Sequence, residues 1–398
     1  MPNKKQDTTI ILILGGMNMI GPFTTDMYLP AFSAIANGLH TTVHVVGYSL
    51  SSYFAGICLG QLMHGPLVDR FGRKKPLLIF LGLYIISTLA CSQAASVEGL
   101  IVYRFFQALA ASCGMVVSRA VVRDLFPADK IAKVFSMLIL VMGVAPIIAP
   151  TVGGYVVAGW GWKAVFWTLA AIGAVVLLLV FLILPESRGA DKTVSLRPAA
   201  IFSRYRLVFS HPQFKPFAFA TAMNTGGLFA YIAGSSFVYM QLLGVSEKQF
   251  GWVFGFNAVC FITGSQINRL LLRFSKSYLI AARMVIFQLA VSLFLILLVA
   301  NGWMTVATLM ATTGMYAVCL GVIGPNTMAL TLHPFVNNAG VASSSLGSLQ
   351  MGAGAVSAGL VSYFSSGTAL PMAAVMAVAT GLGLVSLHVG LKTYREKP

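Results

Sequence analysis

The sequence has few charged residues and very few acidic ones. Only 9% of its 398 residues are charged and 10 are acidic, whereas 58% are hydrophobic. Soluble chains carry roughly 25% charged residues, so this composition excludes an ordinary soluble protein and predicts an integral membrane protein. A hydrocarbon core of about 30 Å needs ~20 apolar helical residues per crossing, and the chain has room for about a dozen crossings.

The sequence also lacks the short motifs of enzymes and metal sites. It contains no H-E-x-x-H, G-x-S-x-G or P-loop pattern, and its six histidines are scattered. The cysteines lie in apolar runs and show no C-x-x-C spacing, which excludes a disulfide framework: they are Cys58, Cys91, Cys113, Cys260 and Cys319. We therefore expect neither an enzyme nor a protein that binds a metal or an organic cofactor.

Apolar runs separated by glycine, proline or charge clusters predict twelve membrane helices, and hence an all-α membrane protein. Their approximate bounds are 8–30, 43–64, 76–95, 99–121, 132–158, 164–184, 214–238, 249–267, 278–300, 304–330, 337–363 and 369–391. With the N-terminus in the cytoplasm, only Lys163 and Lys248 fall in external loops, as the positive-inside rule requires. The net charge of +16 is thereby explained without a nucleic-acid partner. We predict a multi-pass membrane protein with both termini in the cytoplasm.

The longest polar interruption divides the chain into two sets of six helices. It predicts an N-terminal six-helix bundle over 1–184, a cytoplasmic linker over 185–213 and a C-terminal six-helix bundle over 214–398. A weak internal repeat supports this division, because a glycine, an acid or amide and an arginine recur after spans 2 and 8, as Gly65-x-x-x-Asp69-Arg70 and Gly264-x-x-x-Asn268-Arg269.

Asp26 is the only acidic residue inside a predicted span. A charged side chain in hydrocarbon costs at least ~2.5–3.5 kcal/mol on insertion scales, so we expect a partner or a function for it. Arg104 lies about five residues, or roughly 8 Å, inside span 4 and at a similar depth. Pairing would favour the ionised acid and separation the protonated acid, which is a proton switch. Alternatively, each side chain reaches the outer interface or caps a helix end.

The fifth span carries two prolines four residues apart and a glycine pair. Prolines bend a helix, and glycines let a neighbouring backbone approach closely, so the segment suits a moving interface between bundles. The alternative is a statically kinked helix. The residues are Gly143, Pro146, Pro150, Gly153 and Gly154.

Four stretches together resemble the major facilitator superfamily, and more narrowly its drug:proton antiporters of the bicyclomycin/chloramphenicol-resistance (Bcr/CflA) type. The stretch 25–31 is similar to the first-helix motif of that branch, and 65–74 to the superfamily's loop 2–3 signature. The stretch 104–108 resembles the fourth-helix motif, with Ala108 in place of the usual Gly. The run 143–154 resembles the fifth-helix antiporter signature, with Ala145-Pro146 where its best-known form has Gly-Pro.

The resemblance implies a proton-driven exporter of the bacterial inner (cytoplasmic) membrane that works by alternating access. It implies that Asp26 is the titrating acid, that Arg104 is its partner, and that the proton gradient is the energy source without any cofactor. It also implies a charge relay of Asp69, Arg73 and Asp124 that holds the outward-facing state. We expect a monomer whose partners are a small-molecule drug, protons and the lipid bilayer.

By similarity to the superfamily, a central cavity should be lined by spans 1, 4, 7 and 10, with contributions from 2, 5, 8 and 11. Candidate substrate contacts, each of which could instead be a packing residue, are Met19, Phe23, Tyr48, Gln107, Met142, Asn224, Tyr231, Asn257 and Gln350. The second half has no acid in a span, so we expect neutral or weakly charged lipophilic substrates such as phenicols, bicyclomycin-like or sulfonamide-like antibiotics.

Other functions stay open on the sequence alone. A proton-coupled transporter of a metabolite (a sugar, amino acid or siderophore) is disfavoured by the fifth-span motif but not excluded by it. A receptor or a channel is also conceivable, although the sequence shows no ring of acidic or basic pore residues.

Overall fold

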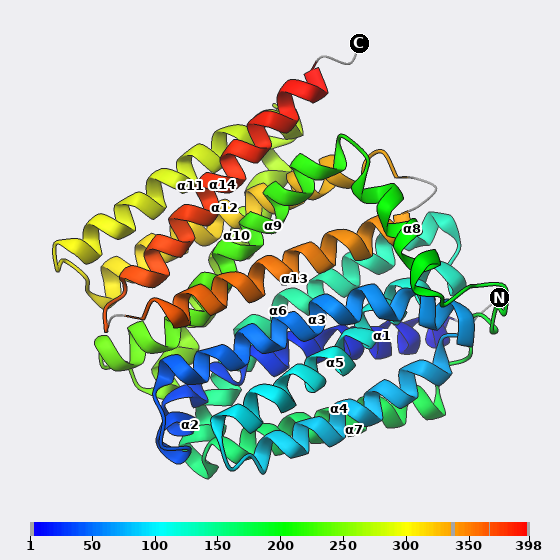
Figure 1. Cartoon of the computed structure of the whole chain (residues 1–398), viewed down its shortest axis with the longest axis horizontal. Helices are drawn as coiled ribbons and strands as arrows, with labels where there is room; N and C mark the ends of the chain where they lie inside the picture. Colours follow the sequence, from blue (N-terminus) through cyan, green and yellow to red (C-terminus); the bar gives the residue numbers. More distant parts are fainter. Residues whose placement is uncertain (1–3, 336–338, 366, 396–398) are drawn as a thin grey trace.

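The computed structural model describes residues 4–335, 339–365 and 367–395, apart from the side chains of 4–7, 128–129, 132–133, 136, 139–142 and 393–395. The elements in these ranges are helical (Figure 1). They are α1 (Lys4–Asp26), the short 3-10 helix η1 (Leu29–Ala31), α2 (Phe32–Gly38), α3 (Val43–Phe71), α4 (Lys74–Ser92), α5 (Val97–Leu125), α6 (Ala128–Trp160), α7 (Trp162–Leu182), α8 (Pro198–Phe209), α9 (Phe214–Ser236), the π-helical η2 (Phe237–Leu242), α10 (Glu247–Leu271), α11 (Ser277–Ala300), α12 (Val306–Leu332), α13 (Ala339–Tyr363) and α14 (Leu370–Arg395).

Twelve long helices in the described residues coincide with the twelve predicted spans: α1, α3 to α7 and α9 to α14. The predicted all-α fold is confirmed. Within the described ranges, ten segments are long and apolar enough to cross a membrane, and α9 and α13 are not among them. Both of these helices are rich in glycine, alanine and serine and pack against each other, so neighbouring protein replaces part of the lipid contact.

Side-chain caps fix where several of the helices begin. The hydroxyls of Thr42 and Ser96 accept backbone N–H groups of the first turns of α3 and α5, and Ser246 and Thr305 form capping boxes on α10 and α12. A cap satisfies an otherwise unpaired backbone donor and typically contributes ~1 kcal/mol. The end of the molecule that carries Arg70, Arg73 and Lys74 is called the basic end. The four caps lie at the other end of the molecule, which we call the opposite end.

The first membrane segment is broken beside Asp26. The helix α1 ends at Asp26, and Pro30 follows four residues later. A proline has no N–H group and its ring collides with the carbonyl four residues earlier, so it kinks or breaks a helix, and at this point the helix is broken. The chain makes a single 3-10 turn and then resumes as α2, so the first membrane segment extends to Gly38.

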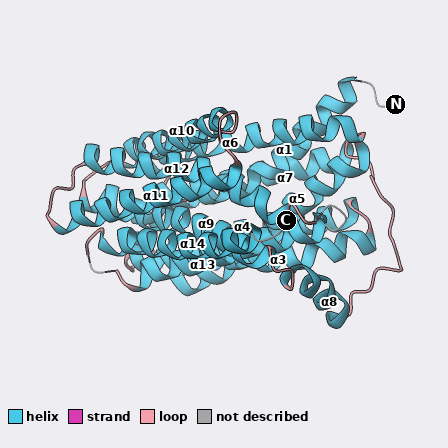
Figure 2. Cartoon of the chain, turned by 90° about the horizontal axis from the view of Figure 1, so that it is seen from above, coloured by secondary structure: helices cyan, strands magenta, loops and turns pink. Residues whose placement is uncertain are grey.

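The helices of the two halves lie side by side, with the first half below and the second half above in Figure 1, and Figure 2 shows the same arrangement from above. The largest apolar core contains residues of both halves and includes the region of the α1 break. Among the described residues, one further core lies in the first half and two lie in the second half. One of these two also contains Val208 and Phe209 of α8. The halves are therefore joined by a shared core toward the opposite end.

Two seams connect the halves, one between α3 and α13 and one between α6 and α10. On the first seam, the Phe54 ring lies 4.0 Å from that of Phe229 in α9 (centroid to centroid), and Ser51 donates to the Ala355 carbonyl at 2.6 Å. Nearer the opposite end, Ser236 donates to the Leu29 carbonyl at 2.6 Å. Side-chain and backbone contacts thus close this end of the molecule.

The predicted linker contains the helix α8, which lies at the edge of the molecule in Figure 2. The Tyr205 hydroxyl donates to the Leu62 carbonyl in α3 at 2.9 Å, and Val208 joins a core with residues of α9 and α13. Burial raises the pKa of Tyr205, so the hydroxyl remains a donor at neutral pH. The segment 185–213 therefore contacts both halves beside the α3–α13 seam.

The weak repeat noted between the halves corresponds to two different clusters. In the second half, Asn326 donates to the Asn268 side chain at 2.6 Å, and Ser277 donates to Asn326 at 2.7 Å. The cluster at Asp69 in the first half contains ion pairs. The second half thus holds neutral amides where the first half holds charges.

Candidate functional site

Asp26 lies at the break in the first membrane segment and is buried, with 5% of its surface exposed. No hydrogen bond or ion pair to its carboxyl group is found within the described residues. The sequence analysis placed Asp26 about four residues from the end of its span. That depth was wrong, because α2 extends the segment by a further two turns beyond the break.

Arg104 in α5 is fully buried and contacts residues on both sides of Asp26 in the chain. One amino group donates to the Thr24 carbonyl at 3.2 Å and to Gln107 Oε1 at 2.7 Å. The guanidinium carbon lies 4.3 Å from the ring centroid of Tyr28 and 4.2 Å from that of Tyr53. The expected ion pair between Arg104 and Asp26 is not found within the described residues.

The two tyrosine rings explain how the cation is held without a carboxylate. A guanidinium over an aromatic face gains about 2 kcal/mol or more when it is removed from water, and Arg104 has two such faces. Within the described residues, its Nε and Nη2 atoms have no hydrogen-bond partner. Tyr53 is also close enough to Asp26 to interact with it electrostatically. The arginine therefore keeps two free donors near the residues that flank the unpaired acid.

The rings of Tyr28 and Tyr53 form a cage around the Arg104 guanidinium, and further hydroxyl and amide groups hold this cage in place. The Tyr28 hydroxyl is bonded to Ser49 Oγ at 2.7 Å, and Thr24 Oγ1 to the Tyr84 hydroxyl at 2.7 Å. Gln107 also donates to Thr88 Oγ1 at 2.8 Å, so both ends of its amide are occupied. The sequence analysis missed this cage; its only sequence signal is Tyr28, two residues after Asp26.

The three side chains of the implied charge relay lie together at the basic end. Arg73 contacts the Asp69 carboxylate through one amino group and Asp124 Oδ2 through Nε, at 2.5 and 3.0 Å. Burial lowers the pKa of Arg73, but the hydrogen bonds to Asp69 and Asp124 outweigh it and raise the pKa above its ordinary value. The 4% exposed guanidinium thus ties the end of α3 to the end of α5.

Glu186 completes this cluster and was missed by the sequence analysis. Its carboxylate accepts the backbone N–H groups of Arg73 and Lys74 at the start of α4, where negative charge is favoured at a helix N-terminus. The turn before α4 places Gly72 at φ +86°, a conformation that disfavours residues with a Cβ. The position of Glu186 in the sequence, after the last helix of the first half, gave no sign that its carboxylate contacts the start of α4.

The glycine pair of α6 makes two different close approaches. A Cβ at Gly153 would lie 2.4 Å from the Met27 carbonyl oxygen at the α1 break, within the first half. A Cβ at Gly154 would lie 2.4 Å from the Glu247 carbonyl oxygen at the start of α10, in the second half. Pro146 and Pro150 lie inside α6, and Gly143 faces Ile262 of α10. The glycine pair thus lies against Met27, the residue after Asp26, on one side and against the start of α10, at the α6–α10 seam, on the other.

The candidate substrate contacts do not form one group in this structure. Asn224 accepts from Gln288 at 3.4 Å inside the second half, and Gln350 donates to Thr225 at 3.0 Å. Tyr231 and Asn257 are both buried and lie beside each other.

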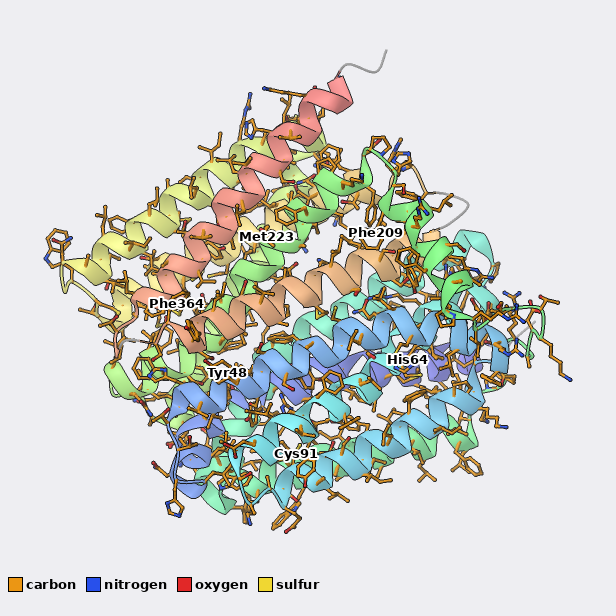
Figure 3. The ribbon with its side chains drawn as sticks, in the orientation of Figure 1. Tyr48, His64, Cys91, Phe209, Met223 and Phe364 are labelled. Carbon is orange, nitrogen blue, oxygen red and sulfur yellow. The ribbon has the colours of Figure 1, made fainter. Side chains whose placement is uncertain are left out.

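The remaining candidates are less informative. Met19, Phe23 and Tyr48 are half-buried, and Figure 3 shows Tyr48 and His64 near opposite ends of α3. The side chain of Met142 lies outside the described residues.

This architecture defines a class, a multi-pass helical membrane protein with two sets of six long helices. The family model of the Major Facilitator Superfamily matches residues 14–358, and the chain belongs to that superfamily. It is a transporter and not an enzyme.

Relatives of known name support this assignment. The chain is 32% identical over 397 residues to the bicyclomycin resistance protein homolog of Haemophilus influenzae, covering 98% of this chain and 97% of the relative. It is 29% identical over 349 residues to the multidrug resistance protein MdtL of Escherichia coli, covering 84% and 83%. A D-xylose-proton symporter structure superposes with a TM-score of 0.74 at 15% identity over 97% of each chain, a likeness of fold alone.

Proposed function

We propose that this protein is a proton-coupled antiporter that exports small, uncharged or weakly charged lipophilic drugs by alternating access. The substrates would include phenicols, bicyclomycin-like and sulfonamide-like antibiotics. The observation that carries the proposal is a buried, unpaired acid at a helix break, whose flanking residues Thr24 and Tyr28 contact a buried arginine with two free donors. Two relatives named for bicyclomycin and multidrug resistance support drugs as the substrate class.

In this mechanism Asp26 alternates between two environments. With Arg104 held on the two tyrosine rings, Asp26 has no counter-ion, which favours its protonated form because an unpaired charge is costly away from water. When the halves rearrange and Arg104 turns toward Asp26, the ion pair favours the carboxylate and the proton leaves. One proton is bound and released for each cycle, and the protein needs no cofactor.

Orientation and surroundings follow the same proposal. The basic end faces the cytoplasm, both termini lie there, and the chain functions as a monomer in the bacterial inner membrane. The cluster of Asp69, Arg73 and Asp124 would hold the cytoplasmic ends of α3, α4 and α5 together in the outward-facing state.

Accumulation of chloramphenicol in everted membrane vesicles, with and without a proton gradient, tests this function. An antiporter accumulates the drug only when the vesicle interior is acid, whereas a proton-coupled importer releases it under the same gradient. The variant Asp26→Asn has a matched shape but cannot titrate, so drug-driven proton movement should be lost. Normal proton movement in this variant would contradict the role of Asp26.

A further inference from the structure

Within the described residues, three buried polar atoms of the second half have no hydrogen-bond partner. Two of them are neighbours, the hydroxyl of Tyr231 in α9 and the side-chain oxygen of Asn257 in α10, and each of these two residues is 5% exposed. The Asn257 amide nitrogen donates to the Val253 carbonyl in its own helix at 3.2 Å, which leaves only the oxygen unpaired. Such an atom costs ~1–3 kcal/mol, and folded proteins contain few of them.

The two groups lie next to each other on an apolar wall. The Asn257 side chain lies within interaction range of the Tyr231 hydroxyl, but the two groups do not meet the geometry of a hydrogen bond. The Tyr231 ring stacks on Phe254 with centroids 6.0 Å apart and an interplanar angle of 22°. The charged residues of α9 and α10 are confined to the helix ends, and α12 has none. The surroundings therefore offer hydrogen bonds without charge.

Both residues border the core that the two halves share. Tyr231 and Phe254, whose rings stack, belong to the apolar cluster that contains residues of both halves, and Asn257 lies about one turn beyond Phe254 on α10. We expect separation of the halves at this core to expose the two polar atoms together.

We propose that Tyr231 and Asn257 form a hydrogen-bonding subsite for an uncharged substrate. A hydroxyl or amide N–H of the substrate donates to Asn257 Oδ1, which can only accept, and a carbonyl or hydroxyl oxygen accepts from the Tyr231 hydroxyl. The inference rests on the proposed export function and narrows its substrates to uncharged molecules with a neighbouring donor and acceptor. Organic cations without such groups would gain nothing from this pair.

Binding of two probes to the purified protein in lipid nanodiscs tests the subsite. Chloramphenicol is uncharged and carries hydroxyl and amide groups, whereas tetraphenylphosphonium is a cation with neither. Tyr231→Phe should weaken chloramphenicol binding by about three- to tenfold, the effect of one lost hydrogen bond, and leave binding of the cation unchanged. Equal affinity of wild type and variant for chloramphenicol, or an equal loss for both probes, would overturn the subsite. Wild-type protein that binds neither probe would instead count against the proposed function.

Tyr239→Phe is the matched control in the same half. The Tyr239 hydroxyl is paired with Thr313 Oγ1 at 3.3 Å, so its removal should lower the melting temperature without changing chloramphenicol affinity. Removal of the unpaired Tyr231 hydroxyl should leave the melting temperature unchanged or raise it. If Tyr231→Phe lowers the melting temperature as much as Tyr239→Phe and spares affinity, the hydroxyl is structural and the proposal is wrong.

Discussion

Gly154 is the position where one added methyl group should separate the two halves at the opposite end. A Cβ there would lie 2.4 Å from the Glu247 carbonyl oxygen and 3.0 Å from its carbon. Ordinary van der Waals contact begins near 3.4 Å, so α6 and α10 would have to move apart by about 1 Å. Both atoms are backbone, and no rotamer change can relieve the collision.

Overpacking of this kind costs ~1–3 kcal/mol. In Gly154→Ala this cost applies only while α6 touches α10, and it disappears when the halves part at this end. The equilibrium should therefore shift toward the state open at the opposite end by about 5- to 150-fold.

Gly153→Ala and Gly159→Ala provide matched comparisons on the same helix. The Cβ at Gly153 would meet the Met27 backbone within the first half, so it should lower the free energy of unfolding but not bias the two states. A Cβ at Gly159 would meet nothing within 4 Å, so Gly159→Ala should be neutral or stabilising by about 0.5–1 kcal/mol.

Electron–electron spin distances can measure the shift. Nitroxide labels can be attached to cysteines placed at Glu98 and Asn301, in a protein whose native cysteines are replaced. Both residues are exposed and lie at the opposite end of the molecule, at the start of α5 and directly after α11. The distance between the labels reports the separation of the halves. Gly154→Ala should enlarge a longer-distance population, and the other two variants should not. An unchanged distribution in Gly154→Ala, or the same shift in Gly153→Ala, would refute this account of the seam.

Two further changes test the cage and the charge cluster. Tyr53→Leu removes one of the aromatic faces on Arg104 and should shift the pH at which proton-driven drug transport in vesicles is half-maximal, whereas Tyr53→Phe keeps the ring and should not; equal profiles for both would argue against the cage. Arg73→Ala leaves Asp124, whose side chain is 15% exposed, without its cation and should lower the free energy of unfolding by ~1–3 kcal/mol in thermal melts. The pKa of Arg73 is raised. Its contribution to the free energy of unfolding is therefore complete below the ordinary pKa of arginine and is lost only at strongly alkaline pH. The difference in stability between wild type and Arg73→Ala should not fade as the pH rises through neutrality.

The number and placement of the long helices were predictable because each membrane crossing requires a run of apolar residues. Counting residues along a helix gives only an approximate depth, and the break after Asp26 was enough to make its predicted depth wrong. Depth does not fix the direction of a side chain around the helix axis. Whether the Arg104 guanidinium contacts a carboxylate or two tyrosine rings depends on that direction, and the sequence pattern does not indicate the direction.

The segment 185–213 shows a second limit. Its prolines and charges indicated a connector, yet Tyr205 and Glu186 contact helices far away in the sequence. Their partners are backbone groups, a carbonyl and two N–H groups, which every residue type offers. No residue pattern at Leu62 or Arg73 could therefore have marked these contacts in advance.

The contrast between the two repeat-related clusters has a consequence for the response to salt. Mobile ions screen charges over a Debye length of about 8 Å at 0.15 M ionic strength, and the Asp69 side chain is 42% exposed. The hydrogen bond between Asn268 and Asn326 joins neutral groups that are 4% and 2% exposed, and screening leaves it intact. Rising ionic strength should therefore weaken the charge cluster of the first half more than the amide cluster of the second half. Two halves of like architecture would then respond differently when the salt concentration at the basic end changes.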